Sequence, residues 1–210
     1  MDKQEELEKI AREIAACKTC PLAKSATHSV PGNGNPNAEI MLLGEGPGYW
    51  EDQKGIPFVG PAGKLLDELL ASIGLNREKV FTTNVVKHRP PANRDPLPEE
   101  IKAYKPFLDR QIGVIEPKVI ITLGRFAMNY FLPLAKISRD HGKGRIIEYN
   151  KRRLILIPMF HPAAALRGAE IEKQLREDFK KIPEEIKKLE KISNPGEIPP
   201  KKEKEQLKLI

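Results

Sequence analysis

Three polar side chains that could take part in chemistry follow short apolar runs of this sequence. Glu45 stands in a glycine-rich turn, Asn84 ends a second run, and His161 follows the last run. A carboxylate held by a rigid backbone can orient or activate water, and an amide side chain offers both a hydrogen-bond donor and an acceptor. A histidine ahead of Pro162 can either cap a helix or take part in catalysis. Glu45, Asn84 and His161 are therefore the first candidates for a reactive site.

The elements that must position these residues are strands that alternate with helices. Four runs rich in apolar and β-branched residues predict buried strands, and amphipathic patterns between most of them predict helices. This alternation is typical of an α/β fold with a parallel sheet, in which a ligand binds beyond the carboxyl ends of the strands. The basic residues 151–153 are expected in a solvated hairpin before the last strand. The expected strands are residues 39–43, 80–86, 118–123 and 153–158, and the expected helices are residues 3–16, 64–73, 98–115 and 170–191.

The composition excludes several classes of protein. The 210 residues include 36 Lys and Arg against 29 Asp and Glu, which gives a net charge of +7, and 40% of them are hydrophobic. This content supports a domain with a sizeable core and excludes a disordered polyelectrolyte over most of the chain. No apolar stretch is long enough to span a bilayer, and the acidic start lacks the order of a secretory signal. We therefore expect a soluble, cytoplasmic protein whose two cysteines are reduced, and not a disulfide scaffold.

Charge and residue usage also favour particular partners and sources. The mild basic excess favours an anionic partner, nucleic acid first, and the density of Lys and Glu is compatible with a thermophilic source. Residues 1–192 are expected to form one domain, and residues 193–210 a charged, flexible tail without a core pattern. The tail ends in QLKLI, which is faintly similar to a sliding-clamp peptide but lacks its aromatic pair. No clamp partner is therefore assigned.

Three longer strings resemble, in order and spacing, the family 4 uracil-DNA glycosylases, the thermostable iron-sulfur type of archaea and bacteria. They are GEGPGYWEDQKGIPFVGPAGKLLDELL, TNVVKHRPPANRDPLPEEI and FHPAAALR, and the resemblance runs from about residue 17 to residue 179. It implies a three-layer α/β/α fold with a central four-stranded parallel sheet. It also implies a DNA repair enzyme that flips uracil out of DNA and hydrolyses its N-glycosidic bond, leaving an abasic site. The expected partner is uracil-containing DNA, bound by a monomer away from membranes.

The resemblance implies roles for the residues of the strand-end loops. Glu45 with Gly46-Pro47 would wall the base pocket, and Glu45 would position the attacking water. Phe58 would stack on the flipped uracil, although an aromatic in a Gly/Pro-flanked loop can also plug the core. Asn84 would read the O4 and N3–H edge of the base, a pattern that disfavours cytosine. His161 would stabilise the charge on the departing uracil through its O2.

Further residues match family positions around the pocket. Glu51 would lie near the C5 edge and discourage a thymine methyl group. Leu166 would fill the vacated place in the base stack and Arg167 would contact phosphate, whereas ordinary helix-start packing is the alternative for both. The basic residues expected to ring the pocket and meet phosphate are Lys87, Arg89, Arg94 and Arg167.

The family's iron-sulfur site is incomplete in this sequence. Family members hold a [4Fe-4S] cluster with four cysteines, and Cys17 and Cys20 match the first pair, but His88 and Tyr104 stand at the later two positions. Histidine is a known substitute for a cluster cysteine, whereas tyrosine is a poor one. The open alternatives are an altered cluster, a zinc ion held by the two cysteines and His88, and an empty site. A redox dithiol is less consistent with a C-x-x-C that follows a helix and precedes Pro21.

Two other functional classes are weighed against a glycosylase. A relative that captures uracil-containing DNA without turnover would keep the pocket and lose the chemistry. A redox or metal-handling protein would use Cys17, Cys20 and His88, but it would leave the glycine-rich and HPAAALR strings unexplained. The enzyme is favoured because the sequence keeps the complete set of residues that the reaction would use, Glu45, Phe58, Asn84 and His161.

Overall fold

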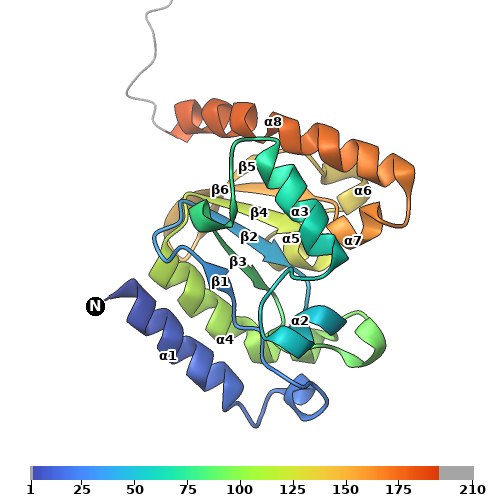
Figure 1. Ribbon diagram of the computed structural model, residues 1–210. Coiled ribbons are helices and arrows are strands. Elements are labelled where there is room, and N and C mark those ends of the chain that lie inside the picture. Colours follow the sequence, from blue (N-terminus) through green and yellow to red (C-terminus); the bar gives the residue numbers. More distant parts are fainter. Residues whose placement is uncertain (1, 194–210) are drawn as a thin grey trace, which may run out of the picture.

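The computed structural model describes residues 2–193, in which helices cover both faces of one mixed sheet (Figure 1). The sheet has six strands in the order β1-β3-β2-β4-β6-β5. The strands are β1 (Asn33–Gly34), β2 (Ile40–Gly44), β3 (Val80–Asn84), β4 (Val119–Leu123), β5 (Arg145–Tyr149) and β6 (Arg152–Met159). The helices are α1 (Lys3–Ala15), α2 (Tyr49–Lys54), α3 (Pro61–Ala71), α4 (Pro98–Ile115), α5 (Arg125–Phe131), α6 (Ile137–Asp140), α7 (Pro162–Ala165) and α8 (Ala169–Ser193), with short 3₁₀ turns η1 (Pro21–Lys24), η2 (Arg77–Lys79) and η3 (Pro91–Asn93).

The four central strands are parallel, as the sequence predicts. β2 lies between β3 and β4, with Ile40 opposite both Val80 and Val119, and β6 pairs with β4 on the other side. The expected four-stranded sheet is extended at both edges by antiparallel strands, because β1 pairs with β3 and β5 pairs with β6. β5 and β6 form the expected basic hairpin, and Asn150 and Lys151 take the positive φ values of 51° and 64° that a tight hairpin turn favours.

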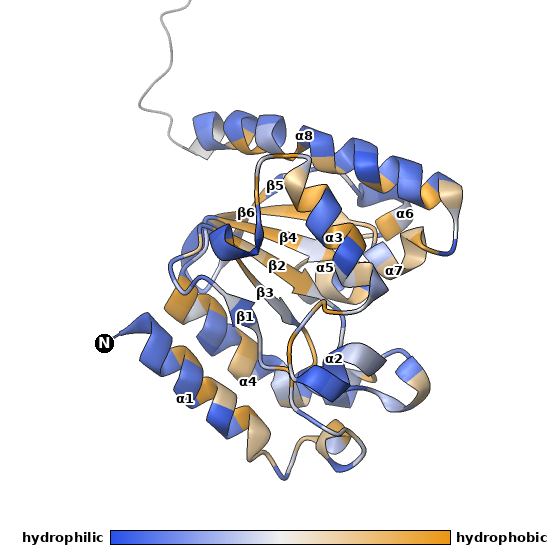
Figure 2. Cartoon of the chain, in the orientation of Figure 1, coloured by the Kyte–Doolittle hydropathy of each residue, from blue (hydrophilic) through white to orange (hydrophobic). Residues whose placement is uncertain are grey.

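Two hydrophobic layers hold the helices to the sheet, which confirms the expected three-layer arrangement. Leu42 of β2 packs with α3 and α8 on one face, whereas Met41 and Leu43 pack with α1 and α4 on the other. Figure 2 shows the apolar strands at the centre and the hydrophilic sides of α1 and α8 turned outward. This arrangement brings the loops that follow β2, β3, β4 and β6 to one edge of the sheet.

The remaining expectations concern the ends of the chain and its surroundings. Among residues 2–193, no helix combines the length and the apolar character needed to cross a membrane. Residues 194–210, which hold nearly all of the expected tail, lie outside the described residues. The division into a domain and a tail therefore stays a prediction.

Candidate active site

A cavity opens at the carboxyl ends of the parallel strands, where the sequence predicts the site. Its volume is about 510 Å³, within the range of pockets that hold a small organic ligand. The loops after β2, β3, β4 and β6 all contribute to its walls, together with the segment that joins α2 to α3. The predicted residues that line it are Glu45, Gly46, Pro47, Glu51, Phe58, Asn84, Arg94, His161 and Arg167.

Glu45 follows the last residue of β2, and its carboxylate lies against the start of α5. It accepts a hydrogen bond from the N–H of Phe126 at 3.2 Å. Gly124 leaves room for it, because a Cβ there would lie 2.3 Å from Glu45 Oε1. Burial raises the pKa of Glu45 above its usual range, and the Phe126 N–H opposes that effect only in part. A carboxylate that is fixed and partly desolvated in this way is suited to activate water.

Gly44, the last residue of β2, brings two predicted base-binding residues together. A Cβ on Gly44 would lie 2.3 Å from Asn84 Oδ1 and 2.6 Å from Phe58 Cζ, so both side chains occupy the space above the strand end. Sequence reasoning missed this role. The sequence feature that could have predicted it is a glycine at the end of a strand, because such a glycine often marks a place where another group approaches the backbone closely.

The Asn84 side chain is buried and incompletely bonded. Its exposed fraction is 2%, and its Oδ1 and the Thr122 Oγ1 are the buried side-chain atoms without a hydrogen-bond partner in the described part of the chain. Of the two residues, only Asn84 lines the cavity. A buried acceptor without a partner is costly, so this atom is suited to bond a donor on a ligand in the cavity.

Phe58 has a strained backbone that its neighbours hold in place. Its φ of 54° lies in the left-handed region, which is unfavourable for a large side chain. The guanidinium of Arg77 donates to the carbonyls of Phe58 at 3.1 Å and Gly63 at 3.2 Å. Gly63 permits this close packing, because a Cβ there would lie 1.8 Å from the Phe58 oxygen. The Phe58 ring belongs to a core cluster and also lines the cavity. The residue therefore fills the core and forms part of the pocket wall at the same time.

His161 is the N-cap residue of α7, so one of its two predicted roles is observed directly. Its Nδ1 accepts the N–H of Ala163 at 3.1 Å, which leaves Nε2 to carry the proton of the neutral ring. Burial, helped by the nearby charge of Arg167, lowers the pKa of His161 to about 4. The ring lies nearly parallel to that of Phe58, with centroids 6.1 Å apart. The imidazole is therefore neutral at neutral pH, with one N–H free to donate to a ligand.

Glu51 braces the wall of the cavity through backbone hydrogen bonds. Its carboxylate accepts the N–H groups of Val59 and Gly60, each at 2.9 Å, and that of Gly48 at 3.1 Å. These bonds tie the first turn of α2 to the loop that carries Phe58. Glu51 lines the cavity, but its carboxylate oxygens accept hydrogen bonds from the main chain. The role expected for Glu51 at the C5 edge of the base therefore stays a prediction.

Lys87 does not ring the pocket, and that prediction is wrong. Its side chain is fully buried beneath the end of β3, where the ammonium group donates to Thr83 Oγ1 at 2.6 Å and to the Asn84 carbonyl and Gln111 Oε1, each at 2.7 Å. Desolvation lowers the pKa of Lys87 well below its usual range. Three oxygen acceptors on neighbouring elements turn this side chain inward, which its place in a basic loop does not reveal.

The other predicted DNA-contacting residues lie around the cavity. Arg94 lines it but forms an ion pair with the buried Glu100 at 2.6 Å. Arg89 and Arg167 have no carboxylate within 4.0 Å in residues 2–193. Leu166 is 52% exposed at the end of α7. Their contacts with DNA stay predictions, and the structure leaves the two arginines and the leucine accessible for them.

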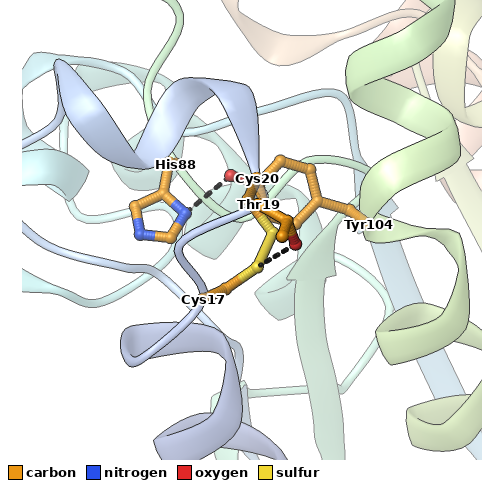
Figure 3. Close-up of a disulfide and its surroundings, with 5 residues drawn as sticks. All are labelled: Cys17, Thr19, Cys20, His88 and Tyr104. Carbon is orange, nitrogen blue, oxygen red and sulfur yellow. Dashed lines mark hydrogen bonds between the residues drawn. A yellow bond between two sulfur atoms is a disulfide. The ribbon is translucent and has the colours of Figure 1, made fainter.

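The structure brings the four positions of the expected cluster together (Figure 3). Cys17 and Cys20 form a disulfide, so the expectation that both thiols are reduced is wrong for this structure. His88 Nδ1 and the Tyr104 hydroxyl lie 2.8 Å apart in a hydrogen bond. Burial lowers the pKa of His88 and raises that of Tyr104, so the phenol donates and the neutral imidazole accepts.

These donor atoms do not fit a four-ligand cluster. The two sulfur atoms are bonded to each other, and the Tyr104 hydroxyl keeps its proton and occupies His88 Nδ1. Cys20 and Tyr104 pack with Leu22 in an apolar cluster. Within residues 2–193, no three His, Cys, Asp or Glu side chains gather in a way that would hold a metal ion. The zinc alternative meets the same difficulty, because it needs the two thiolates free.

Comparison with known proteins defines the class that this fold and pocket represent. The family model of the uracil DNA glycosylase superfamily matches residues 31–187, which include the sheet and every wall of the cavity. The chain is 50% identical over 184 residues to the type-4 uracil-DNA glycosylase of Sulfurisphaera tokodaii, covering 85% of this chain and 84% of the relative.

Two further relatives place the chain within that class. The type-4 enzyme of Archaeoglobus fulgidus is 49% identical over 185 residues, covering 86% of this chain and 93% of the relative. That of Saccharolobus solfataricus is 47% identical over 186 residues, covering 86% of each chain. The chain belongs to the type-4 uracil-DNA glycosylase family.

The close approach over Gly44 gives a test of the pocket. Gly44→Ala should lower kcat/KM for uracil excision by about a hundredfold, because Asn84 or Phe58 must move when the new methyl group enters their space. Gly113→Ala is the matched control, since nothing lies within 4 Å of a Cβ at that helical position, and it should leave excision unchanged. Equal rates for the two folded variants would contradict the geometry described above.

The donor set at Cys17 and Cys20 gives a second test. The purified protein should contain far less than one iron-sulfur cluster per chain and stay colourless after anaerobic treatment with iron, sulfide and reductant. The combined variant His88→Cys and Tyr104→Cys, treated in the same way, should become brown because four thiolates are then available. A stoichiometric cluster in the unsubstituted protein, measured by iron content and visible absorption, would overturn the assignment.

Proposed function

We propose that this protein is a DNA repair glycosylase that removes uracil from DNA and leaves an abasic site. The observation that carries the proposal is the buried, unpartnered Oδ1 of Asn84 at the wall of a cavity that Glu45 and His161 also line. A base inside a duplex cannot reach such a cavity, so it must be flipped out of the stack. The names and identities of the type-4 relatives support the same conclusion.

Asn84 reads the base edge in this proposal. The N3–H of uracil donates to Oδ1, and the uracil O4 accepts from the amide nitrogen of the same side chain. Cytosine presents an acceptor at N3 and a donor at its exocyclic amine, so both contacts would be lost and Oδ1 would stay buried without a partner. The cost of that unpaired atom supplies the discrimination.

Glu45 and His161 carry the bond-breaking step. Glu45 takes a proton from water as the water oxygen attacks C1′ of the sugar, and the bond from C1′ to N1 breaks with its electron pair leaving on uracil. The neutral His161 donates from Nε2 to O2 of the departing anion, because its Nδ1 is occupied by the Ala163 N–H. Helix capping and leaving-group stabilisation thus use opposite sides of one ring.

Three residues contact the DNA outside the base pocket in this proposal, namely Arg89, Arg167 and Leu166. The two arginines lack carboxylate partners in the described residues and are free to meet phosphates. Leu166 enters the stack where the uracil leaves it, and its half-exposed position at the end of α7 supports this role. Phosphate contacts of this kind make binding weaken as the salt concentration rises.

The proposed reaction needs no iron-sulfur cluster. Every group assigned to it is a side chain of the cavity or its rim, and the positions that would hold the cluster are occupied by a disulfide and a Tyr104–His88 hydrogen bond. The function proposed here is therefore that of a cluster-free member of the family.

The decisive experiment uses a labelled oligonucleotide with one uracil, incubated with the protein and then with alkali, and a thymine strand as control. Turnover should give breaks only at uracil, and Asn84→Asp should reduce them strongly. His161→Ala should lower kcat by about a hundredfold or more with little change in DNA affinity, because the donor acts on developing charge. Selective binding of uracil-containing DNA without breaks would show a capture protein instead of an enzyme.

The pKa shifts predict the pH dependence of excision. The rate should fall as pH decreases through the raised pKa of Glu45, since the base is lost when the carboxylate gains a proton. No step should appear near pH 6.5, the ordinary value for histidine, because His161 is neutral down to about pH 4. A rate that falls as pH rises through that region would mean that the imidazolium is the active form, contrary to the assignment above.

A further inference from the structure

Two large aromatic side chains are exposed beside the cavity. Tyr49 and Trp50 begin α2 and are 50% and 51% exposed, with ring centroids 5.2 Å apart in an edge-on pair. Their chain neighbours Gly48 and Glu51 both line the cavity. The two aromatic residues do not themselves line the cavity and do not belong to the core clusters, so they stand at the rim of the pocket, half exposed.

The surroundings of the pair hold it at this rim. Trp50 rests on the loop that carries Phe58, since a Cβ on Gly60 would lie 3.0 Å from Trp50 Cδ1. Tyr49 faces the Arg89 guanidinium, whose central carbon lies 5.2 Å from the ring centroid. Arg89 in turn donates to Asn93 Oδ1 at 2.6 Å. Asn93 lines the cavity, so the aromatic pair and its cation connect two of the cavity walls.

We propose that Tyr49, Trp50 and Arg89 form a platform on which an unpaired base of single-stranded DNA stacks, next to the uracil in the pocket. The proposal rests on the proposed function and names the strand form that the site favours. Half-exposed aromatic faces beside a cation are the arrangement on which single-stranded nucleic acids bind, because every base has a face to stack and every phosphate a charge to meet.

The geometry favours a single strand over a duplex for a simple reason. In a duplex, the neighbours of a flipped nucleotide stay paired inside the helix, and Leu166 covers the faces that they expose at the vacated place, so they have no free face to offer to the rim. In a single strand, the neighbouring base can leave its stack without disrupting a helix. It can then lie face to face on one ring of the Tyr49–Trp50 pair, with the other ring, inclined at 79°, against its edge. The platform therefore contributes to binding of a single strand and little to binding of a duplex.

A binding measurement tests the platform independently of excision. Trp50 is the only tryptophan of the chain, so the intrinsic tryptophan emission reports on this position alone. A single-stranded oligothymidine that lacks uracil should quench the emission in a saturable way, whereas a duplex of the same length should quench it much less. Tyr49→Ala keeps the reporter and should weaken single-strand binding about tenfold. Absence of quenching, or equal quenching by both forms, would overturn the proposal.

Kinetics with uracil-containing substrates give the second measurement. Trp50→Ala should raise KM for a single-stranded substrate about tenfold with kcat unchanged and should leave KM for the duplex within twofold. Trp50→Phe keeps an aromatic face and should restore most of the loss. Leu134→Ala, which trims a side chain that is 93% exposed and does not line the cavity, is the control and should change neither substrate.

The outcomes separate this proposal from the proposed function. Quenching by oligothymidine with no excision of uracil would support the platform and refute the glycosylase. Normal excision with equal losses on both strand forms, or with no rescue by Trp50→Phe, would refute the platform and keep the glycosylase. Stronger quenching by single-stranded RNA than by DNA of the same length would also overturn the proposal, since it would make RNA the favoured partner.

Discussion

The site depends on one steric constraint, the missing side chain of Gly44. Asn84 and Phe58 share the space above this residue, so the atoms that would read a base edge and cover a base face are fixed relative to each other and to the sheet. Phe58 reaches this place with a left-handed backbone, which the bonds from Arg77 and the bare Gly63 maintain. Strain of this kind persists only where the surroundings over-determine it, as they do here.

A second layer of polar contacts makes the end of β3 rigid. Lys87 lies fully buried with three oxygen acceptors, one of them the carbonyl of Asn84 itself. Thr83 and Gln111, the other two, both bond onward to the Pro31 carbonyl at 2.7 Å. A satisfied buried network of this type holds one arrangement of the main chain, so the backbone from which the Asn84 side chain enters the cavity is fixed before any ligand arrives.

Patterns of the sequence predict the central sheet and most of the cavity, because parallel strands carry long apolar signals and their carboxyl ends must converge. They do not predict β1, since two residues are too few to show an alternating pattern. They misplace Lys87, because one of the three acceptors that hold it inward, Gln111, lies 24 positions away in the chain, and the two nearer ones do not show from the sequence that the side chain turns back over the strand. The double use of His161 also needs coordinates, since composition cannot tell which ring nitrogen a helix end will occupy.

The loop that follows β3 carries Val86, His88 and Pro90 and lies between the pocket and α4. Its contacts on both sides could keep the shape of the pocket without a cluster. One side of this loop faces α4, where His88 bonds to Tyr104 and Val86 packs with it. The other side faces the pocket, where Pro90 forms part of the wall and Val86 lies close to Gly46. The pocket wall keeps its position if the spacing between this loop and α4 is fixed. A hydrogen bond between the two buried side chains His88 and Tyr104, with apolar packing around it, supplies that spacing, and in the cluster-free enzyme proposed above this pair takes the place of metal ligands.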